Sequence, residues 1–317
     1  QRAWTKEQIS KFMLTKKGIK DFDYSEPEFL ISTMDRHKEW AVIICLVGGG
    51  QEINTGEAGL PEWFDSLRRQ FLDWDVYITP NLNDEEYRRS NEWKDLIMGL
   101  NVYEVEKLHL STSVRSFRTP DLADLIKAIL DVNINKAKVL YDRCKFKYPM
   151  IITREIAKAK AWIRTQCQGT TRYGLLASSG ALRLKPEGIF VKNDISVENW
   201  FLNEKNDVRS SYYLEDVVTE FDIQGLELDY SIVAWDADLR FENNEWNYYN
   251  FSGKRWNNVN SINKRIYLKN SYRVLLTRAR QGMVIFIPKG DNDDNTRETK
   301  YYDGIYNYLK AIGIDEI

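Results

Sequence analysis

The chain has 317 residues and a formal net charge of −2, with 43% hydrophobic and 29% charged residues. This balance is typical of a soluble globular protein that is long enough to bury one or two cores. The net charge excludes a global basic field of the kind that indicates a nucleic-acid-binding protein, although a local basic groove would suffice.

Cysteine and histidine spacings bear on metal sites and compartment. No CxxC pair occurs and both histidines lie far from ligand-like spacing, so the sequence predicts neither a metal site nor a disulfide framework. This cysteine usage indicates a reducing compartment, and we expect the cytoplasm. No apolar run approaches the length of a membrane span, so no membrane partner is predicted. The residues concerned are Cys45, Cys144, Cys167, His37 and His109.

In the first hundred residues, strand-like and helix-like pieces alternate. The run "WAVIICLV" (Trp40–Val47) is continuous, apolar and rich in β-branched residues, which predicts a strand buried on both faces. A helix is predicted over Pro61–Phe71, and a second strand over Trp74–Pro80.

A second unit is predicted from about residue 147 onward. Strands are predicted at Tyr148–Thr153, in "TRYGLLAS", on both sides of a turn at Gln224–Gly225, and in "MVIFIP" near the end. Helix-like stretches separate them, which implies βαβ units and a parallel sheet. The predicted fold class is therefore α/β.

One segment breaks this alternation. Leu239–Asn260 gathers several aromatic residues around a Ser252–Gly253 turn, which predicts a β-hairpin inserted into the second unit. Its aromatic rings either stack on nucleic-acid bases or stabilise the hairpin and cover the scaffold, and cross-strand aromatic pairs favour the second alternative. The candidate stacking residues are Trp246, Tyr249 and Trp256.

Three further stretches carry groups suited to phosphate chemistry. The strand at Trp40–Val47 ends in three glycines and Gln51, where open α/β sheets bind ligands, although a solvated glycine turn is an equal alternative. Arg115 follows a predicted strand, and acidic groups surround the turn in "EFDIQGLELD". Finally, "YRVLLTRARQGMVIFIP" places Arg278 and Arg280 where a helix meets a buried strand.

The order of these motifs resembles the C-terminal part of a superfamily 1 helicase core, and more closely the Schlafen-related DNA/RNA helicase domain family. "LVGGGQEI" is similar to motif III, which implies that Gln51 senses the γ-phosphate beside Gly50. "LSTSVRSFR" resembles motif IV, whose arginine, here Arg115, reaches the γ-phosphate. "YRVLLTRAR" resembles motif VI, which implies that Arg278 is the second arginine finger, and Arg280 is interpreted as structural or as the partner of an acid.

The same resemblance extends to motif V. "TEFDIQGLELD" is similar to that motif, which implies that Thr219 contacts nucleic acid and that Gly225 and Glu227 lie at the nucleotide. Gln224 stands where many relatives have Lys. The resemblance therefore implies a RecA-like P-loop NTPase fold with ATP and Mg²⁺ as cofactors and DNA or RNA as partner.

Two departures from the family pattern limit this expectation. The sequence contains no GxxxxGK[ST] and no Asp-Glu pair placed to hold magnesium. Gln1 opens a stretch that looks like the tail of motif II, which implies that Gln1 lies at the nucleotide. We therefore expect residues 1–118 to be the end of a first RecA-like domain and residues 119–317 to be a complete second one, with an insert at about 239–260. On this expectation the chain by itself is inactive, the missing N-terminal RecA-like segment is its partner, and exposed strand edges favour self-association.

Three functions fit the resemblance. The first is an NTP-dependent DNA/RNA helicase or translocase. The second is an NTPase module that powers a fused nuclease or restriction-type protein. The third is a nucleic-acid-binding module without catalysis, so whether the chain belongs to an enzyme stays open at this point.

Overall fold

The computed structural model describes residues 3–46, 53, 59–80, 95, 97–109 and 121–317. The chain divides into two compact units, Gln1–Thr112 and Ser113–Ile317, which are described separately below as unit 1 and unit 2. The predicted domain boundary after residue 118 lies outside the described residues.

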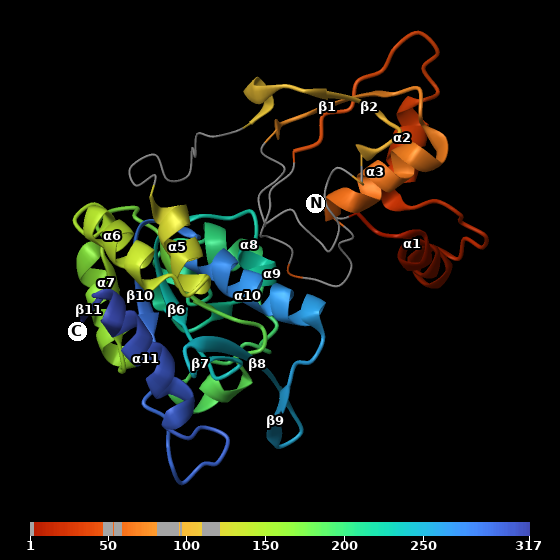
Figure 1. Cartoon of the computed structure of the whole chain (residues 1–317). Coiled ribbons are helices and arrows are strands. Elements are labelled where there is room, and N and C mark those ends of the chain that lie inside the picture. Colours follow the sequence, from red (N-terminus) through yellow and green to blue (C-terminus); the bar gives the residue numbers. More distant parts are fainter. Residues whose placement is uncertain (1–2, 47–52, 54–58, 81–94, 96, 110–120) are drawn as a thin grey trace. The chain divides into compact units, whose positions relative to one another are not determined.

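Unit 2 is built on a six-stranded parallel sheet with the strand order β11-β3-β10-β6-β4-β5 (Figure 1). The prediction of an α/β fold with a parallel sheet is confirmed. The strands are β3 (Met150–Thr153), β4 (Tyr173–Ala177), β5 (Val217–Val218), β6 (Leu228–Ala234), β10 (Ala279–Phe286) and β11 (Asp315–Glu316).

Both faces of this sheet are buried along its central strands, where apolar residues predominate. One face packs against helix α7 (Ile156–Gln166), whose Ala159 and Ile163 are fully buried. Alternate residues of the strands lie on the two faces. Those on the α7 face are Ile151, Leu175, Ile232 and Val284, and those on the opposite face are Ile152, Leu176, Val233 and Ile285.

Four longer helices of unit 2 pack against one another: α5 with α6 and α10, and α6 with α11. Their bounds are α5 (Leu122–Leu130), α6 (Ile134–Cys144), α10 (Ile262–Leu276) and α11 (Lys300–Ile312). Shorter elements complete the unit: η5 (Leu182–Glu187), α8 (Val197–Leu202), η6 (Ser211–Tyr213) and α9 (Glu220–Ile223).

The predicted aromatic hairpin is present, but it has three strands rather than two. β7 (Leu239–Glu242), β8 (Glu245–Ser252) and β9 (Arg255–Asn258) form an antiparallel sheet with a turn at Gly253, as expected. The additional turn between β7 and β8 uses Asn243 and Asn244 at positive φ, a conformation that asparagine tolerates in tight hairpins.

Unit 1 contains mostly short elements around a small apolar cluster. The two-stranded sheet is parallel, and the cluster comprises Ile31, Phe64, Leu67, Phe71 and Ile78. The elements are α1 (Lys6–Phe12), η1 (Met13–Lys17), α2 (Glu26–Met34), α3 (Gly59–Gln70), β1 (Asp75–Ile78), β2 (Asn101–Glu104) and η4 (Glu106–Leu108). The predicted helix after Pro61 and the predicted strand after Trp74 are confirmed as α3 and β1.

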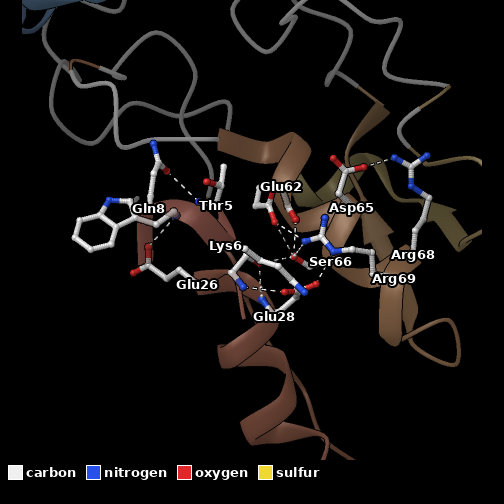
Figure 2. A network of polar contacts seen from close by, with 12 residues as sticks. Thr5, Lys6, Gln8, Glu26, Glu28, Glu62, Asp65, Ser66, Arg68 and Arg69 are labelled. Atoms are coloured by element: carbon white, nitrogen blue, oxygen red, sulfur yellow. Dashed lines mark hydrogen bonds and ion pairs between the residues drawn. The ribbon is translucent and has the colours of Figure 1, made fainter. Parts of the chain in front are cut away.

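A polar network joins α2 to α3 in unit 1 (Figure 2). Glu28 is completely buried, and the guanidinium of Arg69 donates to Glu28 Oε1 and to Glu62 Oε1, each at 2.5 Å. The hydroxyls of Ser25 and Ser66, both fully buried, lie 3.0 Å apart beside it. Because each buried carboxylate has a charged partner, the network avoids an unpaired buried charge.

The prediction of a buried strand at Trp40–Val47 is wrong for the residues that the structure describes. Residues 40–46 form no strand, and β1 pairs with β2 instead of with this run. Trp40 is 76% exposed and Ile44 82% exposed. A strand is buried only where neighbouring strands satisfy its N–H and C=O groups, and this run has no such partner among the described residues.

No helix of the described residues is long and apolar enough to cross a membrane.

Candidate nucleotide and nucleic-acid site

Two residues that the resemblance implies to contact the nucleotide lie at the N-terminal ends of neighbouring strands of the parallel sheet in unit 2. Glu227 immediately precedes β6, and Arg278 immediately precedes β10. β6 and β10 are neighbours, with Leu228 paired with Ala279, and the Leu228 N–H donates to the Arg278 carbonyl oxygen at 3.0 Å. The sheet therefore brings the stretches that resemble motif V and motif VI side by side, although they are far apart in the sequence.

The Arg278 side chain folds back onto the helix that precedes it. It is 1% exposed, and its Nε donates to the carbonyl oxygen of Val274 at 3.0 Å. A second guanidinium nitrogen lies 3.4 Å from the Thr277 hydroxyl. A cation at this position is favourable, because the C-terminal turn of α10 presents unpaired carbonyl oxygens and a partial negative charge.

Arg280 lies in a different environment. Its side chain is 49% exposed and donates to Asp229 Oδ1 at 2.8 Å, and Gln281 donates to the same oxygen at 2.9 Å. The backbone N–H of Arg172 donates to the other Asp229 oxygen at 2.8 Å. The interpretation of Arg280 as the partner of an acid is confirmed.

The turn before β6 requires its glycine. Gly225 has φ +95°, and no atom lies within 4 Å of where a Cβ would stand. The space would admit a side chain but the backbone conformation is strained for one. This turn sets the position of Glu227, the last residue before β6.

Thr219 lies at the C-terminal end of β5 and is the N-cap residue of helix α9. Its backbone N–H and its hydroxyl both donate to Asp222 Oδ2, at 2.8 and 2.7 Å, which caps the short helix. Thr219 is 7% exposed, whereas Phe221 on the same helix is 48% exposed. The stretch that resembles motif V therefore runs from the C-terminal end of β5, at Thr219, to the N-terminal end of β6, at Glu227.

Trp246, one of the candidate base-stacking residues, lies inside unit 2. It is 8% exposed, its indole N–H donates to the Leu130 carbonyl oxygen at 2.8 Å, and its ring stacks on Trp235 with centroids 5.6 Å apart. These contacts favour the packing alternative for this residue.

Tyr249 and Trp256 surround a buried arginine of the same sheet. The Arg240 guanidinium, 4% exposed, lies 4.0 Å from the Tyr249 ring centroid, 5.3 Å from that of Trp256 and 3.6 Å from that of Tyr301. Arg240 Nε donates to the Ala237 carbonyl oxygen at 2.9 Å. Cation–π contacts of this kind connect the hairpin to α11, which carries Tyr301.

Four other predicted site residues lie outside the described part of the chain. They are Gln1, Gly50, Gln51 and Arg115.

A comparison with protein-family models matches residues 1–289 to the Schlafen group 3, DNA/RNA helicase domain. The chain belongs to this family. The match covers most of the chain and confirms the resemblance to the Schlafen-related helicase domain family. No curated protein and no solved structure shows a significant match to the chain.

This Schlafen-type helicase domain also buries two acids that the sequence analysis did not select. Asp236 and Asp238 follow β6, and each is 1% exposed. Asp238 accepts hydrogen bonds from the Tyr272 hydroxyl at 2.5 Å and the Ser178 hydroxyl at 2.7 Å. The signal available in the sequence was "WDAD", two acids spaced by one residue directly after a buried apolar strand.

The surroundings of these acids change their protonation. Burial, followed by the neighbouring charge of Asp236, raises the pKa of Asp238 to about 7. Burial also raises the pKa of Asp236, which accepts hydrogen bonds from the Tyr302 hydroxyl and the Arg183 backbone N–H. Among the residues placed by the structure, no group of three or more His, Cys, Asp or Glu side chains could hold a metal ion.

Proposed function

We propose that this Schlafen-type domain supplies residues for NTP hydrolysis coupled to movement along DNA or RNA, as part of a helicase or translocase. The observation that supports the proposal most strongly is that Glu227 and Arg278 stand at the starts of two neighbouring parallel strands. An acid and an arginine at neighbouring strand ends suit a nucleotide, because the arginine can stabilise the charge that develops on a transferring phosphoryl group.

In this proposal, Arg278 is the arginine finger and Glu227 and Gly225 lie at the nucleotide. Arg278 reaches a phosphate only if its side chain leaves the Val274 carbonyl oxygen, to which it now donates. The exchange is chemically reasonable, since a phosphate oxygen is a stronger acceptor for a guanidinium than a peptide carbonyl. Gln51 and Arg115 are proposed as the γ-phosphate sensor and the first arginine finger, from the resemblance alone.

The nucleic acid is proposed to contact motif V at its other end, near Thr219. The exposed ring of Phe221 and the capped start of α9 lie at that edge of the sheet. The proposed domain organisation follows, with residues 1–118 as the end of a first RecA-like domain and residues 119–317 as the second.

ATP is the proposed nucleotide, because the positively charged guanidinium of Arg278 can bind its negatively charged phosphates. Mg²⁺ is proposed to accompany the nucleotide. The described residues form no metal-binding cluster, so no step is assigned to protein ligands of that ion.

The experiment is NTP hydrolysis measured with and without single-stranded DNA and single-stranded RNA. It uses the natural protein, meaning the helicase or translocase of which we propose this chain to be a part. The natural protein is used because the 317 residues contain no phosphate-binding loop. Magnesium-dependent hydrolysis that rises when either nucleic acid is added is the expected result. The 317-residue chain is the control and should bind ATP weakly without turnover, whereas hydrolysis indifferent to both nucleic acids would contradict the proposal.

A further inference from the structure

Glu220 is a buried acid whose hydrogen bonds join three separate elements of unit 2. It is 2% exposed and follows Thr219 directly on α9. The backbone N–H and the hydroxyl of Ser179 donate to its two carboxylate oxygens, each at 2.8 Å. The hydroxyl of Ser271 lies 3.1 Å from Oε1 and 3.0 Å from the Tyr267 carbonyl oxygen, so it shares its one proton between these two acceptors.

The three elements belong to different parts of the proposed site. Ser179 lies in the loop after β4, Glu220 lies on the motif V helix, and Ser271 lies on α10. α10 ends at Leu276, two residues before Arg278. Ser271 precedes Arg278 by about 10 Å at the rise per residue of an α-helix. A single carboxylate therefore connects the loop after β4 and the start of motif V to the helix that positions the arginine finger.

The two faces of α9 differ in a way that suits signal transfer. Phe221 points outward with 48% exposure, while Glu220 is buried and makes all the contacts just described. α9 has only four residues, so a ligand that displaces its outer face displaces the carboxylate with it. Hydrogen bonds to a charged acceptor are short and directional, and Ser271 would follow that displacement.

Stability alone is a poor explanation for a buried acid at this position. Burying a carboxylate costs free energy, and well-packed apolar residues often stabilise such a site equally well. Hydroxyl and amide donors around a carboxylate do specify its position, because each donor must meet a lone pair. The arrangement is therefore better suited to fixing the relative position of α9 and α10 than to strengthening the core.

We propose that Glu220 is a positioning residue that couples nucleic-acid binding at α9 to the placement of Arg278, through its hydrogen bond with Ser271. The inference rests on the proposed function and extends it. In the absence of nucleic acid Arg278 stays on the Val274 carbonyl oxygen through its own hydrogen bond, with or without the bond between Glu220 and Ser271. Nucleic acid at α9 shifts Glu220, and α10 moves with it.

The test uses Ser271→Ala in the natural protein, because this change removes the bond between α10 and Glu220 and leaves Glu220 bound to Ser179. The change also removes the bond from Ser271 to the Tyr267 carbonyl oxygen inside α10, and the melting temperature reports any cost of that loss. Ser261→Ala is the matched control: it lies at the start of the same helix, is exposed, and its side chain makes no capping hydrogen bond. NTP hydrolysis is measured with and without oligo(dT) and oligo(U), alongside the affinity for each oligonucleotide and the melting temperature.

In Ser271→Ala we expect hydrolysis without oligonucleotide and oligonucleotide affinity within about twofold of wild type, while stimulation by the oligonucleotide falls about tenfold, a usual size for coupling between two sites. Glu220→Gln, which keeps the side-chain volume but loses one acceptor oxygen, should show the same loss. Stimulation equal to wild type in both variants would overturn the inference alone. Parallel losses of affinity, basal hydrolysis and melting temperature would also overturn it, by showing a structural role. A wild-type protein that is not stimulated by either oligonucleotide overturns the proposed function as well.

Discussion

The two units of this chain bury their side chains by different means. Unit 2 has a six-stranded parallel sheet with both faces covered, and its central strand residues are almost completely buried. Unit 1 has a two-stranded sheet, a small apolar cluster and the charged network around Glu28. The run Trp40–Leu46 has the composition of a buried strand and yet is largely exposed in unit 1. Composition therefore makes a strand suitable for burial, but partner strands decide whether burial occurs.

This difference matters for function, because every predicted site residue that the structure describes lies in unit 2. The paired strands β6 and β10 there hold Glu227 beside Arg278. Positions on rigid elements are better defined than positions on loops, which suits unit 2 to hold the groups that we propose to act on the nucleotide.

Amide hydrogen exchange should show the largest contrast between the units. We expect the amides of Val284–Phe286 to exchange about a thousandfold more slowly, or more, than those of Ala41–Leu46. The reason is that core strands exchange only through global opening, while unpaired segments exchange freely. Equal protection of the two segments in a monomeric sample would remove the distinction between the units.

Tryptophan substitutions compare the units at single residues. Trp246→Ala in unit 2 should destabilise the chain by about 3–5 kcal/mol, because a large buried ring is lost. Trp40→Ala in unit 1 should change stability by about 0.5 kcal/mol or less, because this side chain is 76% exposed. Denaturant unfolding measures both, and binding of oligo(dT) in the same samples tests base stacking. Weaker binding by Trp246→Ala at unchanged stability would favour the stacking alternative.

Arginine substitutions test what holds unit 1 together. Arg69→Ala should cost unit 1 about 1–3 kcal/mol, because it leaves the buried Glu28 carboxylate without its charged partner. Arg68→Ala is the matched control: Arg68 is the neighbour of Arg69 in the chain, but it pairs with the partly exposed Asp65, so its loss should cost about 1 kcal/mol or less (Figure 2). Limited proteolysis measures the stability of unit 1 separately, through the rate of cleavage within α2 and α3. Equal effects of the two variants would mean that the network around Glu28 contributes little.

A further contrast is expected from the pH dependence of unit 2. The pKa of Asp238 is raised from 3.8 to about 7 in the folded protein, so the folded state binds an extra proton between these values. This group therefore stabilises unit 2 at low pH, and the contribution is lost as the pH rises from about 4 to about 7. Asp236 and Glu220 are the acids whose charges act on it.

Asp238→Asn keeps the neutral form at every pH, and its unfolding free energy should fall less steeply over that range than in wild type. Asp124→Asn, an exposed position on α5, serves as the control and should retain the wild-type slope. An unchanged slope in Asp238→Asn would show that the carboxyl group does not titrate in this window.

The sequence predicted the parts of the fold that depend on local pattern. Apolar β-branched runs bounded by turns identified β3 and β10, and their alternation with helices indicated the parallel sheet. β2 was missed because Asn101–Glu104 is not an apolar run, and it pairs with β1 through main-chain groups that any residue possesses. Local pattern also suggested burial for Trp40–Leu46, which depends on distant strands that no local pattern reveals.

The candidate site was predicted only in part, for a related reason. The motif order placed Glu227 and Arg278 at strand starts, and the pairing of β6 with β10 brings them together. The inward direction of Asp238 and Glu220 was not predictable, because exposed and buried acids look alike in a sequence. Their donors, Tyr272 and Ser271, lie on a helix distant in the chain.

The most direct test of the central claim compares Arg278→Ala with Arg280→Ala in NTP hydrolysis by the natural protein. The two arginines are two positions apart, but one precedes the sheet edge beside Glu227 and the other is paired with Asp229. We expect Arg278→Ala to slow hydrolysis by about a thousandfold or more, the usual scale for an arginine finger, with a smaller change in nucleotide affinity. Arg280→Ala should have a much weaker effect. A larger loss of hydrolysis in Arg280→Ala than in Arg278→Ala would contradict the assignment of the arginine finger and the function built on it.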